Sequence, residues 1–168
     1  MYFDTDVGKL KTYNNYTLNG ITITAYGYTK SKTNDIPTEL YGTNINPDKS
    51  GLGINADVDH EINKNTYIQL DLSGVLSKIE DGSVPQITIQ NIQKHEGFSL
   101  YGSNSVGSLG DELYNSSDNP STQMIPLEWI HSYRYISITA SGELEGANVL
   151  LNSIDYVICR EYVKHPTE

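Results

Sequence analysis

The fold is decided by the stretch Glu96–Tyr114, which reads EGFSLYGSNSVGSLGDELY. Its first part alternates apolar and polar residues, with Phe98 and Leu100 on one face, and this two-residue period is typical of a half-buried β-strand. A polar loop follows and turns through Gly107 and Gly110 into a second alternating segment. The stretch pairs no nucleophile with a base and gathers no metal ligands. Because such loops on a β scaffold serve recognition more often than catalysis, we interpret it as part of a binding or assembly module.

The same alternation recurs along the chain in four further segments, residues 21–25, 68–72, 87–89 and 136–140. A longer and more apolar run over residues 147–158 predicts a central strand. Turn dipeptides separate these runs, and the strongest hairpin signal is Asn19-Gly20. One apolar and one polar face per strand is typical of antiparallel sheets. We therefore predict an all-β fold, a single antiparallel β-sandwich of jelly-roll type with long surface loops.

The length of 168 residues fits one domain. We expect an N-terminal arm or edge strand at residues 1–17, the jelly-roll sandwich at residues 18–160 and a C-terminal tail at residues 161–168. Two polar stretches that contain proline, residues 30–53 and 115–123, are expected to be surface excursions.

Charge and composition exclude several functions. The net charge is −10, and because this field repels a phosphate backbone we expect no nucleic-acid binding. No apolar segment approaches the length of about eighteen residues that a membrane helix needs, so we expect no membrane insertion. Cys159 is the only cysteine, which rules out an internal disulfide, and its apolar neighbours indicate a structural thiol.

Short motifs, met in the same order along the chain, resemble known families. The segments GLGIN, HEIN and YIQLDLS, which begin at Gly51, His60 and Tyr67, are similar to the core of bacterial secreted surface proteins of the PEP-CTERM-associated type. The segment Ile87–Asn104 and the later segments YRYISITAS and NVLLNSIDY also resemble discoidin-like, galactose-binding-type jelly rolls. The resemblance spans about residues 20–157. It implies a jelly roll, a fold that hosts lectins, adhesins, enzyme accessory domains and virion proteins, so it does not fix the function.

Acidic side chains gather in the stretch NADVDHEIN, near Asp48. Oxygen ligands at alternate positions suit calcium, although the spacing is not that of an EF-hand. The resemblance implies a structural calcium ion that binds a loop and holds it against the sandwich. The predicted metal ligands are Asp48, Asp57, Asp59 and Glu61. The alternative is a solvated acidic loop before a strand.

We expect no enzymatic activity. His60-Glu61 begins a zinc-protease pattern, but Lys64 stands where the second histidine belongs. Nucleophilic catalysis needs a serine or cysteine with a base and an orienting group, and no such pattern occurs. Carboxylates that could serve a glycosidase, such as Glu96 and Glu128, are no better paired than in any acidic chain, and a hydrolase is kept only as a third hypothesis.

Aromatic residues offer a surface for recognition, because they concentrate at binding hot spots. The predicted ligand or interface residues are Tyr101, Ser103, Asn104, Trp129 and Tyr133. Further aromatic candidates are Tyr26, Tyr28, Tyr41, Tyr114 and Tyr135. For Trp129 the alternative is a partly buried plug at the end of the sandwich.

These observations favour a non-catalytic structural or interaction module, a decorating or assembly subunit of a larger particle such as a virion surface or an extracellular fibre. The alternative is a carbohydrate-binding or adhesive, lectin-like module stabilised by calcium. The expected partners are proteins, further copies of the chain, or glycans. The expected location is a virion surface or an extracellular surface. No export signal is recognisable in the sequence.

Overall fold

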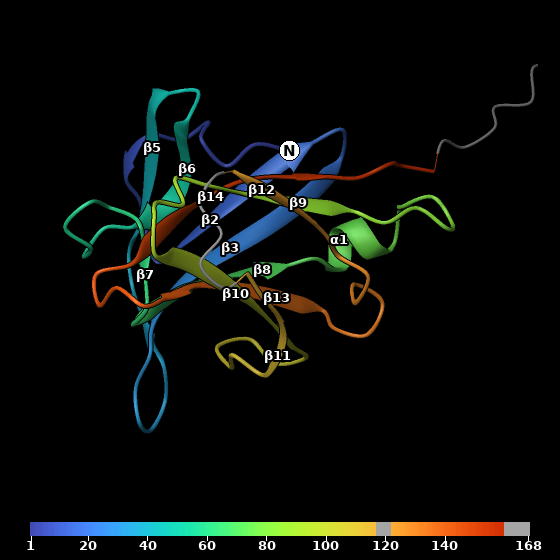
Figure 1. Ribbon diagram of the computed structural model, residues 1–168. Helices are drawn as coiled ribbons and strands as arrows, with labels where there is room; N and C mark the ends of the chain where they lie inside the picture. Colours follow the sequence, from blue (N-terminus) through green and yellow to red (C-terminus); the bar gives the residue numbers. More distant parts are fainter. Residues whose placement is uncertain (117–121, 160–168) are drawn as a thin grey trace, which may run out of the picture.

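The computed structural model describes residues 1–116 and 122–159, which fold into two antiparallel β-sheets (Figure 1). Sheet A contains, in spatial order, β1 (Gly8–Lys9), β5 (Leu40–Asn46), β6 (Lys49–Ile54), β14 (Asn148–Asp155), β9 (Gln86–Gln90) and β12 (Gln123–Pro126), with β7 (Ile62–Asn63) beside β14. Sheet B contains β11 (Asp111–Asn115), β10 (Glu96–Ser103), β13 (Tyr135–Gly142), β8 (Thr66–Asp71), β3 (Ile21–Thr29) and β2 (Tyr13–Leu18), with β4 (Ile36–Pro37) beside β3. The short helix α1 (Ser73–Leu76) follows β8. The predicted antiparallel β-sandwich is confirmed.

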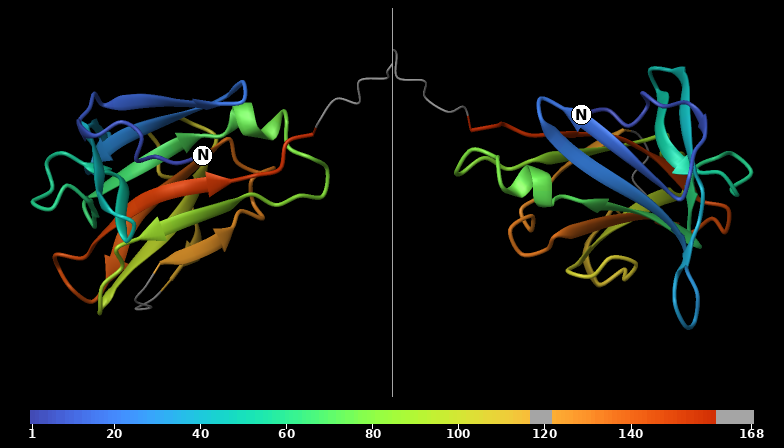
Figure 2. Two further views of the ribbon diagram at one scale, coloured as in Figure 1. Left: turned by 90° about the horizontal axis from the view of Figure 1, so that it is seen from above. Right: turned by 180° about the vertical axis from the view of Figure 1, so that it is seen from behind.

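The chain crosses repeatedly between the two layers, as in a jelly roll. Strand β8 lies in sheet B, β9 in sheet A, β10 and β11 in sheet B, β12 in sheet A, β13 in sheet B and β14 in sheet A. Two further views show the layers stacked on each other (Figure 2). Every crossing carries an apolar strand face into the space between the sheets, so the core is built from segments far apart in the sequence.

The predicted alternation produces this core. In sheet B, Phe98, Leu100, Ile136 and Ile138 are fully buried, and from sheet A Leu151 joins the same cluster. Burying one side chain of this size stabilises the fold by about 1.5–3 kcal/mol relative to leaving it exposed. The opposite face of each sheet B strand is thereby turned outward.

The hairpin between β2 and β3 follows the predicted Asn19-Gly20 turn. Both residues have positive φ, 52° and 76°, as a two-residue type I′ turn requires. This tight turn fixes the register, so that Tyr13 lies opposite Tyr26.

The N-terminal residues pack on the sandwich. Met1 and Phe3 are buried, and the Phe3 N–H donates to the Asn152 carbonyl of β14 at 2.9 Å. Of the predicted arm or edge strand at 1–17, residues 13–17 lie in β2, at the edge of sheet B. The predicted C-terminal tail at 161–168 lies outside the described residues, as do residues 117–121 of the predicted excursion at 115–123. Among the described residues, no helix is long and apolar enough to cross a membrane.

Candidate functional site

The outer face of sheet B is lined with tyrosines from five strands. They are Tyr13 of β2, Tyr26 and Tyr28 of β3, Tyr67 of β8, Tyr101 of β10 and Tyr135 of β13. They share a face because successive residues of a strand point to opposite sides and their aliphatic neighbours fill the core. The ladders place Tyr26 opposite Gln69 and Gln69 opposite Ser137, so these side chains form a row across the sheet.

A loop covers one half of this face. The Gly107 N–H donates to Gln69 Oε1 at 2.8 Å, and Gln69 Nε2 donates to the Ser108 carbonyl at 2.9 Å. The Tyr67 hydroxyl donates to Asp35 Oδ2 at 2.6 Å, and its ring stacks on Tyr28 with 5.2 Å between ring centres. Burial and the bond to Asp35 raise the pKa of Tyr67. This half of the face is closed and serves to hold the loop Ser103–Gly110.

The other half is here called the tyrosine platform, made of Tyr13, Tyr26, Asp71, Arg134 and Tyr135. Tyr26 is half-buried, and Tyr135 is buried. Arg134 donates from Nε and Nη2 to the two oxygens of Asp71, at 3.2 and 2.9 Å, which is the bidentate geometry of strong ion pairs. The Arg134 guanidinium lies 5.1 Å from the centre of the Tyr135 ring. Tyr13 is 45% exposed, and the Arg134 side chain is 53% exposed. The platform therefore combines aromatic rings with a charged, planar hydrogen-bonding group.

Protonation states on the platform follow from these contacts. Although burial opposes ionisation of Asp71, hydrogen bonds from Arg134 and Ser73 lower the pKa of its carboxyl group. Burial and the negative charge of Asp71 raise the pKa of Tyr26. At neutral pH the ion pair is therefore formed, and the Tyr26 hydroxyl keeps its proton as a hydrogen-bond donor.

Four of the five predicted recognition residues lie beside the platform. Asn104 accepts the Arg134 backbone N–H at 2.9 Å, and Ser103 Oγ accepts the Ser105 N–H at 3.0 Å. The hydroxyls of Tyr101 and Tyr133 donate to Glu112 and Asp111, at 3.1 and 3.0 Å. These side chains fix the loop and the approach to Arg134. Trp129 is half-buried in the turn after β12, where its carbonyl accepts the Ser132 N–H.

The carboxylates of two predicted metal ligands, Asp57 and Asp59, accept hydrogen bonds. Asp57 accepts the backbone N–H of Glu61 at 3.1 Å and amide groups of Asn63 and Asn148 at 2.9 and 3.2 Å. Asp59 also accepts the Asn148 amide, at 3.2 Å. The Asp57 carboxylate thus joins the loop between β6 and β7 to β14. In the part of the chain that the structure describes, no three His, Cys, Asp or Glu side chains gather as they would around a metal ion.

Two of the predicted ligands lie in different surroundings. Asp48 is exposed in the turn between β5 and β6, where its N–H donates to Asn46. Glu61 is buried, accepts the Asn91 amide at 2.7 Å and lies 3.8 Å from Lys49 Nζ. Calcium at these residues stays a prediction, and calcium bound to Asp57 would have to displace the amides that now bond to it.

The chain matches no protein-family model, no curated protein and no solved structure. The resemblance to secreted surface β-sandwiches and discoidin-like jelly rolls therefore stays a prediction, and function is argued from the site itself. Tyr13, Asp71 and Arg134 were not among the residues singled out from the sequence. The sequence feature that could have pointed to them is the two-residue period of the strands, because each stands at a polar position beside or within an alternating run.

Proposed function

We propose that the protein is a non-catalytic recognition module that binds carbohydrate through the tyrosine platform. The observation that carries this proposal is the exposed Tyr13 ring and the half-buried Tyr26 on the same sheet face as the bidentate Arg134–Asp71 pair. Sugar rings have apolar C–H faces that stack on aromatic rings, and their hydroxyls bond to planar polar groups. The platform offers both kinds of group on one rigid sheet face.

The charges favour a neutral glycan. Arg134 already neutralises Asp71, so no unpaired positive charge is left for an acidic sugar. The net charge of −10 repels polyanions further. The platform crosses the adjacent strands β13, β8, β3 and β2, which at the usual strand spacing span about 14 Å. A short neutral oligosaccharide fits this length.

A glycan array tests the proposal. The wild-type protein is expected to bind neutral oligosaccharides, and Tyr13→Ala is expected to weaken binding about tenfold or more, because it removes an exposed ring from the platform. Tyr2→Ala is the matched control: Tyr2 is 61% exposed and lies on the N-terminal segment, so its removal should leave binding unchanged. Equal loss in both variants, or no binding to any glycan, would count against the proposal.

A second candidate, the assembly or decorating subunit favoured by the sequence, has support on a different surface. Val7 and Ile45, 64% and 70% exposed, line a hollow of about 170 Å³ where Tyr41 stacks on His60 with 3.8 Å between ring centres. Val58, next in the chain to a residue of this hollow, is 90% exposed. Exposed aliphatic side chains grouped in this way suit contact with another protein subunit.

Sedimentation velocity at rising protein concentration tests this second role. Association of the wild type that Val58→Asp abolishes would support an assembly surface, because a charge in an apolar contact is costly. Val84→Asp, on another exposed valine, is the control. A strictly monomeric wild type that is found in no particle fraction would rule the role out.

A further inference from the structure

Strand β2 is an open edge of sheet B. It stands last in the strand order, and in an antiparallel ladder every second residue points its backbone N–H and C=O away from the partner strand. The Gly27 N–H of β3 donates to the Thr12 carbonyl, which fixes the phase of this ladder. The backbone groups of Tyr13, Asn15 and Thr17 therefore point outward. Within the described residues none of these outward groups has a hydrogen-bond partner.

Within its six residues, strand β2 carries none of the features that usually protect edge strands, although Lys9 and Lys11 precede it. Proline, lysine and bulges commonly prevent another chain from pairing. Strand β2 reads YNNYTL, and its ladder with β3 runs over six residue pairs without a shift of register. The ladder of β10 with β11, at the opposite edge of sheet B, shifts register at Leu100/Tyr101. Strand β2 thus offers a regular template on which another strand can pair.

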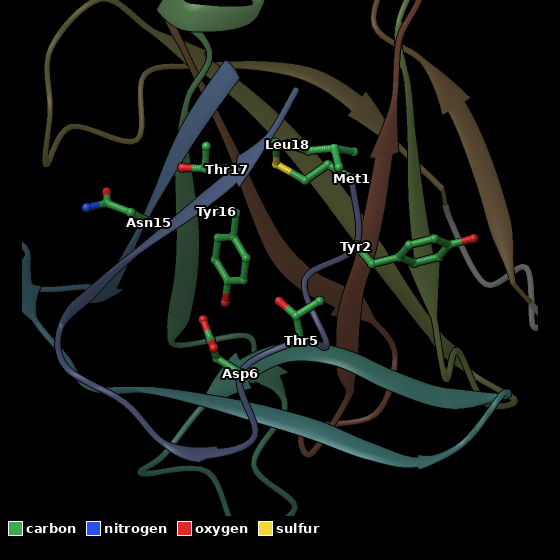
Figure 3. Close-up of a pocket in the computed structure, with 8 residues that line it drawn as sticks. All are labelled: Met1, Tyr2, Thr5, Asp6, Asn15, Tyr16, Thr17 and Leu18. Atoms are coloured by element: carbon green, nitrogen blue, oxygen red, sulfur yellow. The ribbon is translucent and has the colours of Figure 1, made fainter. Parts of the chain in front are cut away.

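A hollow runs beside this edge, between β2 and the N-terminal segment (Figure 3). It measures about 350 Å³, within the range of roughly 300–1,000 Å³ that ligand pockets show. Its apolar walls include Met1, Tyr16 and Leu18, whereas Asn15 and Thr17 point to the other side of the strand. The hollow can therefore take an apolar side chain from a strand that pairs with β2.

A second hollow, of about 620 Å³, continues along the other end of β2 and is lined in part by Lys9, Lys11 and Tyr13. Lys9 Nζ is paired with Glu39 at 3.2 Å, and Lys11 Nζ lies 6.0 Å from the centre of the Tyr13 ring. The first hollow carries Asp6 instead. The two ends of the edge therefore differ in charge. An acidic side chain of the ligand is attracted to Lys11 at one end and repelled by Asp6 at the other.

We propose that the open edge of β2 binds an extended segment of a partner protein, which adds to sheet B as a further strand. Only another extended backbone matches outward N–H and C=O groups at strand spacing, which is the basis of strand addition to a sheet edge. The segment carries an acidic residue near Lys11 and an apolar residue that enters the hollow at Tyr16 and Leu18. Since these two points lie on opposite faces of the sheet, the two residues are an odd number of positions apart on the added strand.

This partner site differs from the tyrosine platform, although Tyr13 belongs to both surfaces. The platform uses side chains on the outer face of sheet B, and the edge uses backbone groups in the plane of the sheet. A change at Asn15, which is outside the platform, therefore separates the two functions.

The probe is an acetylated and amidated peptide of sequence TDTTVTLT, titrated into the ¹⁵N-labelled protein. Saturable shifts of the β2 amides are expected. Amide hydrogen exchange should slow at Tyr13, Asn15 and Thr17, because the peptide backbone bonds to them. Exchange at Asn14 and Tyr16 should change little, because their N–H groups already point toward β3.

Two variants of one residue isolate the backbone contact. Asn15→Pro removes an N–H that the β2–β3 ladder does not use, and should weaken peptide binding about tenfold or more. Asn15→Thr removes the same side chain but keeps the N–H, and should bind as the wild type does. A peptide with N-methyl groups at its pairing positions gives the same test without any change to the protein, and should not bind.

Three results would overturn the proposal. The first is unchanged amide exchange at saturating peptide. The second is equal binding of the normal and N-methylated peptides. The third is a wild type that self-associates and whose dimer Asn15→Pro dissociates, since the occupant would then be a second copy. Loss of glycan binding with the peptide site intact would bear only on the platform.

Discussion

The tyrosines of sheet B show how one residue type takes different roles on a single face. Tyr67 is fully buried and donates to Asp35, so it anchors loops over the sheet. Tyr13, two strands away, is 45% exposed beside Tyr26. The alternating pattern predicts that both point outward. It cannot tell which is covered, because the covering loop comes from residues 103–110.

Glu61 is the residue whose charge state should most affect stability. Burial raises its pKa to about 7, above its usual value of 4.5, and the Asn91 amide and the Lys49 charge offset this only in part. The native state therefore holds a proton that the unfolded chain releases. The free energy of unfolding is expected to fall as the pH rises from about 4.5 to about 7.

The variant Glu61→Gln has no proton to lose at this site. Its free energy of unfolding, relative to wild type, should rise between pH 5 and pH 8 by up to about 3 kcal/mol. Urea denaturation at both pH values measures this difference. Glu145→Gln, at an exposed position, should show no such change. A difference for Glu61→Gln that is the same at both pH values would contradict the assignment.

At the scale of elements, Gln69 should decide whether the loop Ser103–Gly110 stays on the sheet. Gln69→Leu keeps the side chain's size but leaves the Gly107 N–H and the Ser108 carbonyl without their partner. Two lost partners at a buried site should lower the free energy of unfolding by about 2–4 kcal/mol. Proteolysis within the loop should become faster.

The exposed Gln93 provides the control for this prediction. Gln93→Leu is expected to change the free energy of unfolding by no more than about 0.5 kcal/mol and to leave the loop resistant. If Gln69→Leu is as stable and as resistant as Gln93→Leu, the two amide bonds do not hold the loop.

Local signals predicted some elements and missed others: the expected surface excursion at residues 30–53 contains β5 and most of β6, two strands of sheet A. Alternation located the strands around Phe98 and Ile138, and the Asn19-Gly20 pair located a hairpin, because strand period and turn chemistry act over a few residues. The contact of Asp57 with Asn148 joins residues 91 positions apart, so no local pattern could reveal that the acidic loop is held by an amide.

At the scale of the whole molecule, the sandwich followed from the sequence but the candidate site did not. One apolar face per strand requires two layers, whichever strands pair. The platform depends on the strand order β13, β8, β3 and β2, which places Tyr135 opposite Asp71, and Asp71 opposite Thr24, two residues from Tyr26. That order is set by the crossings between the sheets, and composition does not specify them.

We expect the tyrosine platform on sheet B, and not another surface, to bind glycan. The test is to titrate the ¹⁵N-labelled protein with the neutral oligosaccharide that binds best on the array and to map the amide shifts. We expect the shifts to gather at Tyr13, Tyr26, Asp71, Arg134 and Tyr135 and to leave the outer face of sheet A unchanged. Shifts confined to sheet A, or the same shifts in Tyr13→Ala at the same affinity, would contradict this expectation.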